Sequence, residues 1–297
     1  MRRLLAAVLV VAGLTAAACG STASSSGGKL QVVAAENFWG SLAAQLGGDR
    51  VKVTNIIHSP GADPHDYEPT ASDARTMAGA RLVIENGIGY DPWAPKLLSA
   101  NPVDGRVVLN VGDLVGIKTG GNPHRWYSPT NVQQVIDAIV ADYKRLDKDD
   151  AAYFDQQKAK LESQGLAKYN SLIASIRRRF AGVPVGASES IFEPLAEGLG
   201  LKLLTPAGFL NAISEGTDPT AADRSTTDKQ IRTKQIKLWV FNSQNSTPDV
   251  QRLTSEARAA GIPVATITET PTPATASFQD WQSRQLEAIE AALASAQ

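Results

Sequence analysis

Short apolar runs rich in β-branched residues alternate with longer amphipathic segments along most of the chain. The segments between the runs, at 39–46, 70–78, 92–99, 191–199, 248–260 and 278–295, repeat apolar residues at helical spacing. Strands that alternate with helices are typical of parallel α/β sheets. The pattern predicts an α/β protein of two lobes, each with a mostly parallel sheet flanked by helices. The predicted strands are 30–35, 51–57, 82–86 and 107–111 in the first lobe, and 183–187, 238–242 and 264–268 in the second.

The stretch between the two halves, residues 149–181, has a different pattern. It is rich in Ala, Lys, Gln, Leu and Arg, contains no proline, and places apolar side chains at roughly helical intervals. We predict one long, rigid helix here, in which Gly165 is the weakest position because glycine costs about 1 kcal/mol relative to alanine. The lobes would then span residues 30–148 and 182–297.

The N-terminal residues have the pattern of an export signal. Two arginines precede an uncharged apolar run at 4–18, which is shorter than a membrane span of ~20 residues and ends in small residues before Cys19. This arrangement resembles the processing site of bacterial lipoproteins, which implies a signal peptide at 1–18, a lipidated Cys19 and a flexible tether within 19–29. The expected location is the cell surface, on the outer face of the cytoplasmic membrane. The alternative is ordinary secretion without a lipid.

Composition excludes several function classes. The chain of 297 residues has 29 Lys and Arg against 30 Asp and Glu, so it lacks the basic field that nucleic-acid binding requires. A single cysteine excludes an internal disulfide and a zinc site built from several thiolates. With 43% hydrophobic residues the chain has enough apolar material for a packed core. Each of its three histidines is therefore informative.

Two histidines lie in similar proline-bracketed loops that follow strands of the first lobe. His65 belongs to GADPHDYEPT, after the strand at 51–57, and His124 belongs to NPHRWYSPTN, after the strand at 107–111. Both follow a proline and shortly precede a helix start that contains proline, so each imidazole is held on a stiff segment. His58 has no matching partner, and we interpret it as a surface or supporting residue.

Two glutamates follow strands of the second lobe in the same way. Glu189 comes directly after the strand at 183–187, and Glu269 after the strand at 264–268. Because ligands of open α/β sheets bind beyond the carboxyl ends of the strands, two imidazoles and two carboxylates are expected to face each other between the lobes. This mixed set suits Mn(II), Zn(II) or Fe(II), and four protein ligands without an obvious open position favour capture over catalysis.

These segments together resemble a known family. DPHDYEPT, NPHRWYSP, ASESIF and ITET, in this order, are similar to the metal-binding solute receptors of ABC transporters, the zinc and manganese group that includes pneumococcal surface adhesin-like lipoproteins. AAENFWGSLAAQLGGD and LVIENGIGYDPW extend the resemblance. It implies a lipoprotein, expected as a monomer, that captures Mn(II) or Zn(II) and delivers it to a membrane permease. The metal ligands that the resemblance implies are His65, His124, Glu189 and Glu269.

Three departures from the family pattern carry information. Tyr-Ser-Pro at 127–129 replaces the usual Leu-Asp-Pro, although Ser128 can still cap the following helix. Glu269 stands where the family usually has aspartate. Glu189 stands where many zinc receptors have histidine, and residues 113–121 lack the histidine- and acid-rich loop of those receptors. Glu189 and the missing loop favour manganese over zinc.

Two other function classes use the same residues. A secreted zinc hydrolase would hold its metal with His65, His124 and Glu189 and use Glu269 as general base, although the chain has no HExxH or GxSxG motif. A surface adhesin would hold a purely structural metal and unfold under chelation. A metal chelate or haem is a further alternative ligand. We expect a receptor for a bare ion, not an enzyme.

Overall fold

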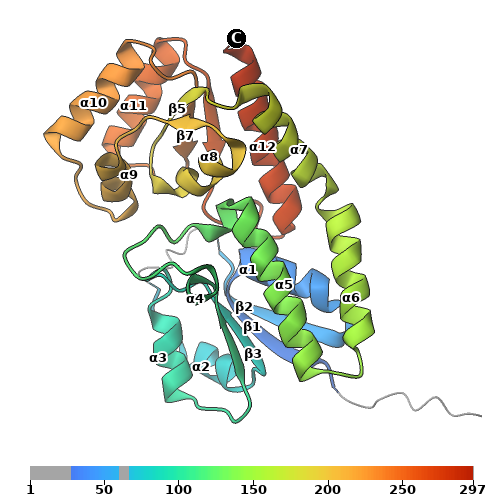
Figure 1. Cartoon of the computed structure of the whole chain (residues 1–297). Helices are drawn as coiled ribbons and strands as arrows, with labels where there is room; N and C mark the ends of the chain where they lie inside the picture. Colours follow the sequence, from blue (N-terminus) through green and yellow to red (C-terminus); the bar gives the residue numbers. More distant parts are fainter. Residues whose placement is uncertain (1–27, 60–66, 297) are drawn as a thin grey trace, which may run out of the picture.

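Two four-stranded parallel sheets lie at the centres of two lobes, within residues 28–59 and 67–296, which the computed structural model describes (Figure 1). The predicted signal peptide, Cys19, most of the tether and His65 lie outside the described residues and stay predictions. Among the described helices, none is both long enough and apolar enough to cross a membrane.

The sheet of the N-terminal lobe has the strand order β2-β1-β3-β4. Its members are β1 (Leu30–Glu36), β2 (Val51–Ile57), β3 (Leu82–Glu85) and β4 (Val107–Asn110), which agree with the predicted ranges to within one residue at each end. Helices connect the strands and cover the sheet. They are α1 (Asn37–Gly47), α2 (Ala71–Ala78), α3 (Trp93–Ala100), α4 (Val111–Val115) and α5 (Pro129–Leu146), with short 3-10 turns at Gly48–Arg50 and Arg125–Tyr127.

The sheet of the C-terminal lobe repeats this topology in the order β6-β5-β7-β8. Its strands are β5 (Pro184–Ala187), β6 (Lys202–Leu203), β7 (Trp239–Asn242) and β8 (Val264–Ile267). Its helices are α8 (Glu193–Leu199), α9 (Ala207–Ser214), α10 (Ala221–Arg232), α11 (Pro248–Ala259) and α12 (Phe278–Ser295), with a 3-10 turn at Ser190–Phe192. In each sheet the first strand lies between the second and the third, and ligands of such sheets bind beyond the strand ends at this point.

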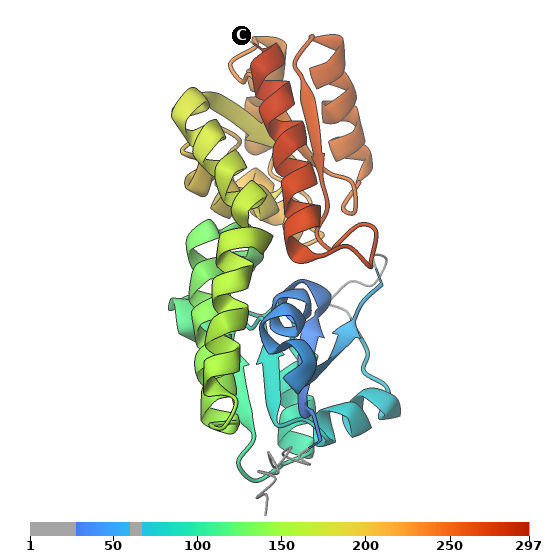
Figure 2. The same ribbon diagram turned by 90° about the vertical axis from the view of Figure 1, so that its right-hand side faces the viewer.

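A nearly continuous helical connection joins the lobes. It consists of α6 (Ala151–Lys160), a π-helical turn (Leu161–Gly165) and α7 (Ala167–Phe180), and it runs along one side of both lobes (Figure 2). The backbone N–H of Leu166 donates to the Leu161 carbonyl at 2.7 Å, which carries the hydrogen bonding across the irregular turn. The predicted long connecting helix is therefore confirmed, and its irregular turn contains Gly165.

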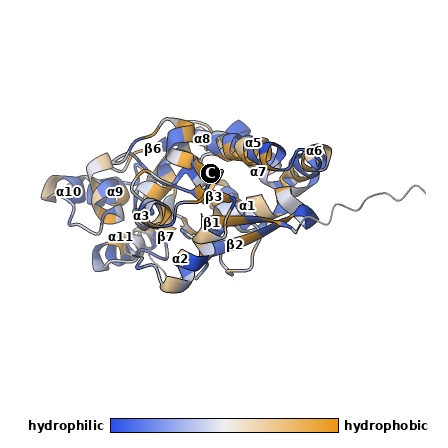
Figure 3. Cartoon of the chain, turned by 90° about the horizontal axis from the view of Figure 1, so that it is seen from below, coloured by the Kyte–Doolittle hydropathy of each residue, from blue (hydrophilic) through white to orange (hydrophobic). Residues whose placement is uncertain are grey.

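Each helix presents an apolar face to the core. In α5 the buried side chains recur three and four positions apart between residues 132 and 143, which is the spacing of one helix face. Hydrophobic and hydrophilic residues accordingly occupy different sides of the helices (Figure 3). Ser128 caps this helix, as predicted, by accepting a hydrogen bond from the Asn131 backbone N–H, and Pro129 occupies its first position.

The largest of the described hydrophobic clusters spans both lobes, and each lobe has a smaller cluster of its own. A single cluster of buried residues extends from Phe38 and Trp126 of the N-terminal lobe to Leu195 and Phe278 of the C-terminal lobe. A hydrogen bond also joins the lobes where the first residue of α12 meets α1: the Phe278 backbone N–H donates to Ser41 Oγ at 2.9 Å. This shared core opposes a large separation of the lobes.

A glycine lets α8 of one lobe approach α5 of the other. A Cβ atom built on Gly198 would lie 2.6 Å from the Pro129 ring, which is closer than carbon atoms pack. We expect Gly198→Ala to lower the free energy of unfolding by about 1–3 kcal/mol, because the helices must separate to admit the methyl group. Denaturant unfolding measures this change. Gly79→Ala is the control, since a Cβ there would make only ordinary contacts, and equal losses in both variants would contradict the prediction.

Candidate metal site

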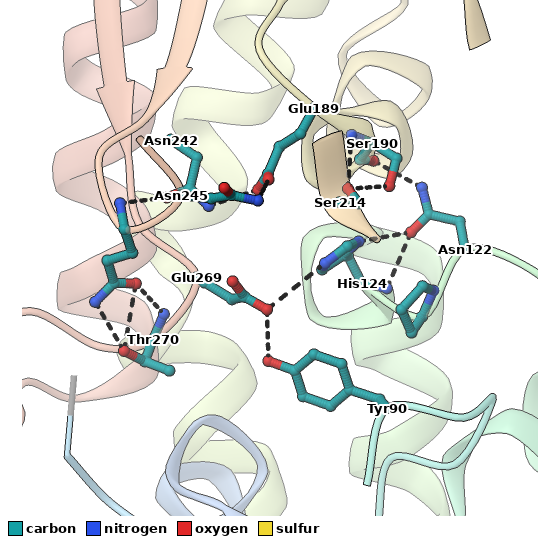
Figure 4. Close-up of polar contacts among 12 residues, drawn as sticks. Tyr90, Asn122, His124, Glu189, Ser190, Ser214, Asn242, Asn245, Glu269 and Thr270 are labelled. Carbon is teal, nitrogen blue, oxygen red and sulfur yellow. Dashed lines mark hydrogen bonds and ion pairs between the residues drawn. The ribbon is translucent and has the colours of Figure 1, made fainter. Parts of the chain in front are cut away.

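The described site residues lie where the carboxyl ends of the strands of the two lobes face each other (Figure 4). His124 immediately precedes the turn Arg125–Tyr127, Glu189 follows β5, and Glu269 follows β8. His124 and Glu189 are only 3% and 2% exposed. The expectation that strand ends bring these side chains together can therefore be tested for three of the four predicted ligands.

His124 and Glu269 meet across the boundary between the lobes. Nε2 of His124 lies 3.7 Å from Oε1 of Glu269, and the Tyr90 hydroxyl donates to the same carboxylate oxygen at 2.9 Å. Within residues 28–59 and 67–296, no group of three His, Cys, Asp or Glu side chains is close enough to hold a metal ion. The described structure thus joins two of the predicted ligands, while Glu189 lies in the same region and makes other contacts (Figure 4).

Asn122 determines which nitrogen of His124 is available. Its Oδ1 atom accepts a hydrogen bond from the His124 backbone N–H at 3.0 Å and lies 2.9 Å from His124 Nδ1. Its Nδ2 atom donates to the Ser190 carbonyl and to Glu193, so the oxygen and nitrogen of the amide are assigned consistently by all their partners. Because a carbonyl oxygen can only accept, Nδ1 carries a proton, and Nε2 is the nitrogen that points toward Glu269.

Aromatic packing holds the His124 ring in place. The Trp126 ring stacks on Phe38 with centroids 4.0 Å apart, and both Trp126 and Tyr90 present edge contacts to the imidazole. The 3-10 turn after His124 directs Trp126 and Tyr127 into the core. The imidazole therefore has little freedom to rotate away from the boundary between the lobes.

Tyr127 links this turn to the other lobe. Burial raises the pKa of Tyr127 well above its usual value, so the hydroxyl stays protonated. It lies 2.8 Å from the carbonyl of Thr268 and from Oε1 of Gln285, and these two acceptors share its single proton. Because Thr268 directly precedes Glu269, this contact places the end of β8 relative to the His124 turn.

Two asparagines orient the carboxylate of Glu189. Asn242 donates to Oε1 and Asn245 donates to Oε2, each from its side-chain amide. Gln244, between them, exchanges hydrogen bonds with Thr270, next to Glu269. The end of β7 and the residues after it thus contact Glu189 directly and bond the residue next to Glu269.

This polar segment was missed by sequence reasoning. The sequence FNSQN covers the end of the strand at 239–242 and the residues after it. The histidines and glutamates were selected because they follow strands, where ligands of parallel sheets bind. The same rule, applied to every polar residue at a strand end, would have selected these amides. Tyr90 and Asn122 were missed because their role depends on contacts with the other lobe.

Three buried acids form a layer at the ends of β1 and β3 and in the segment after β3. Glu36, Glu85 and Asp91 are each at most 5% exposed. Burial raises the pKa of Glu36 well above its usual value and the pKa of Glu85 to about 7. Asp91 accepts from the backbone N–H groups of Asn86 and Gly87 at 2.7 and 2.8 Å. Since the Asn86 side chain donates to the Pro123 carbonyl, this layer supports the residue next to His124.

Two parallel α/β lobes joined by a long helix, with polar side chains of both lobes at the strand ends, define the protein as a two-lobed binding protein. The model of one family, described as the zinc-uptake complex component A, periplasmic (ZnuA), matches residues 32–292. The chain belongs to this family, which confirms the resemblance inferred from the sequence.

Relatives and solved structures agree with this assignment. The chain is 25% identical over 262 residues to the manganese ABC transporter substrate-binding lipoprotein PsaA of Streptococcus pneumoniae, with 81% of each chain covered. It is 30% identical over 199 residues to the iron-binding protein YfeA of Yersinia pestis, covering 63% of this chain and 62% of the relative.

The Mn-bound structure of a periplasmic metal binding protein from Candidatus Liberibacter asiaticus shares the fold. Its TM-score is 0.75 at 21% identity, and the match covers 90% of this chain and 100% of the other. The predicted α/β fold of two lobes is thereby confirmed. The family is one of substrate-binding proteins and not of enzymes, so the hydrolase alternative receives no support, and neither does the adhesin alternative.

Proposed function

We propose that this protein is the extracytoplasmic receptor of an ABC transporter, which captures a divalent transition metal between its lobes and delivers it to a membrane permease. The observation that carries the proposal is the approach of His124 Nε2 to Glu269 Oε1, 3.7 Å apart and from different lobes. An imidazole with its other nitrogen protonated and a facing carboxylate are ligands that such ions prefer. Membership of the family supports the same function.

The proposed ligands are His65, His124, Glu189 and Glu269. His65 lies outside the described residues, and β2, the strand that precedes it in the sequence, ends at the same edge of the sheet as β1. Glu189 can bind a metal while it keeps its contacts with Asn242 and Asn245, because each carboxylate oxygen has a second lone pair. A bound ion would then draw donors of both lobes together.

We propose Mn(II) or Zn(II) as the transported ion, with manganese favoured by Glu189 and by the lack of a histidine- and acid-rich loop at residues 113–121. The names of the relatives include manganese and iron, so the family alone does not select the metal. Affinity for divalent ions rises from manganese to zinc at nearly any site of this type. Zinc should therefore bind more tightly than manganese in a titration even if manganese is the ion carried in the cell.

We also propose that Cys19 anchors the protein to the outer face of the cytoplasmic membrane through lipid, with residues 20–29 as a tether. Several relatives are named lipoproteins, and the sequence before Cys19 has the features of an export signal. The protein would act there as a monomer beside its permease.

Calorimetric titration of the metal-free full-length protein with Mn(II) and with Zn(II) tests this function. We expect one ion per chain, and we expect His65→Ala to weaken the binding of both ions at least ~100-fold, because loss of a nitrogen ligand should exceed the cost of losing a residue that only orients a ligand. His58→Ala is the matched control, and it should bind within about twofold of the parent. Unchanged affinity in His65→Ala would remove His65 from the site, and no binding by the parent protein would contradict the function.

A further inference from the structure

The Asn122 side chain bonds both lobes at once. Through Oδ1 it holds the backbone and the ring of His124 in the N-terminal lobe. Through Nδ2 it donates to the Ser190 carbonyl at 2.7 Å and to Glu193 Oε2 at 2.8 Å in the C-terminal lobe. Because Ser190 directly follows Glu189, this one amide connects the segments that carry two proposed ligands (Figure 4).

We propose that Asn122 is a positioning residue that couples the orientation of His124 to the placement of the turn after Glu189, so that the donors of the two lobes are aligned before a metal arrives. The inference rests on the proposed function, because it concerns the ligands of that site. It assigns to Asn122 a role in metal affinity through other residues, without contact to the ion.

Only a neutral amide fits both sides of this contact. The His124 side requires an acceptor, whereas the carbonyl of Ser190 and the carboxylate of Glu193 require donors. Aspartate would keep the acceptor but would place a carboxylate beside Glu193, and alanine would remove both halves. Substitutions at position 122 can therefore remove the donor alone or both the donor and the acceptor.

The turn after Glu189 is held firmly enough to transmit this contact. The Ser190 backbone N–H donates to Ser214 Oγ at 3.2 Å, and the hydroxyls of the two serines are 2.8 Å apart. Two amides meanwhile hold the Glu189 carboxylate. Because these contacts hold the turn together, a displacement of Ser190 would move Glu189 as well.

Asn122 is a practical residue to replace. It is half-buried and lines an open groove with Arg125, Glu193 and Glu197. Substitution there leaves the shared hydrophobic core unchanged. Asn131, whose amide bonds Gln134 on the surface, provides a matched asparagine control.

The test compares Asn122→Ala, Asn122→Asp and Asn131→Ala in the full-length protein. Nitrogen-15 NMR of the metal-free proteins, at a pH where imidazole is neutral, reports which nitrogen of His124 carries the proton, and calorimetry measures Mn(II) and Zn(II) affinity. We expect the parent and Asn131→Ala to show a single tautomer protonated at Nδ1. We expect Asn122→Ala to show a mixture of tautomers and about 10- to 100-fold weaker binding, the usual effect of losing a partner that orients a ligand.

Asn122→Asp separates the two halves of the contact. It should keep the Nδ1 tautomer, because a carboxylate also accepts, yet bind metal more weakly, because the donor to Ser190 is lost and Glu193 is repelled. The double variant Asn122→Asp with Glu193→Gln supplies an amide donor to the new carboxylate, and it should recover part of the affinity, because the Ser190 carbonyl still lacks its donor.

A purely structural role would give a different result. If Asn122→Ala lost stability but kept one tautomer and parental affinity, the proposal would be overturned, as it would be if the double variant bound no better than Asn122→Asp. Should the parent protein bind neither ion, the proposed function fails, and a single tautomer in Asn122→Ala would still refute the coupling independently.

Discussion

Replacing His124 by alanine is expected to weaken the binding of both Mn(II) and Zn(II) by at least ~100-fold, equivalent to about 2.8 kcal/mol. The substitution removes a nitrogen ligand and leaves Glu269 without the imidazole that lies 3.7 Å from it. Loss of a ligand should exceed the roughly 10- to 100-fold cost of losing a residue that merely orients one. Competition with a chelator of known affinity measures the change.

The control for this prediction must separate metal binding from folding. His124 is 3% exposed and touches Trp126, so alanine also leaves a cavity. His124→Gln keeps most of the volume, and we expect it to bind as weakly as the alanine variant while unfolding near the parental temperature. Parental affinity in both variants would show that His124 is not a ligand.

Replacing Glu85 by glutamine is expected to stabilise the metal-free protein by about 3 kcal/mol at pH 8 and to change it little at pH 4. Burial raises the pKa of this carboxyl from 4.5 to about 7, although a hydrogen bond from Asn110 opposes the shift. The raised pKa means that the folded protein binds more protons than the unfolded chain. Stability therefore falls as the pH rises from about 4.5 through 7, and glutamine, which has no charge to bury, removes this loss.

Denaturant unfolding across this pH range measures the effect. Glu85 is 5% exposed, so solvent screens its charge only weakly. Glu287→Gln serves as the control, because the Glu287 side chain is 46% exposed and its ion pair with Lys168 lies on the surface. The two variants should diverge only above about pH 5, and parallel profiles would refute a raised pKa at Glu85.

The chain pattern identified most of the secondary structure. It left α5 and α9 without a range although their buried residues recur at helical spacing, and it missed elements with weak periodicity. The seven predicted strands carry enough β-branched residues to be recognised, whereas β6 has two residues and no pattern of its own. Helix α10 is mostly polar along AADRSTTDKQIR, and it is defined by Thr220 capping its start and Ile231 entering the core. Such elements form because neighbouring residues bury them, which is not a local property of sequence.

In the site, too, some features follow from local sequence and others only from tertiary packing. By itself the sequence determined the two-lobed α/β fold and placed His124, Glu189 and Glu269 after strands, because strands of a parallel sheet end at a common edge. Only the tertiary structure decided that His124 Nε2 faces Glu269, that Tyr90 joins them, and that amides hold Glu189. These contacts depend on how one lobe rests on the other, through the shared core and through contacts such as Gly198 with Pro129. Residues so far apart along the chain leave no periodic signal, so their geometry appears only when the lobes are packed together.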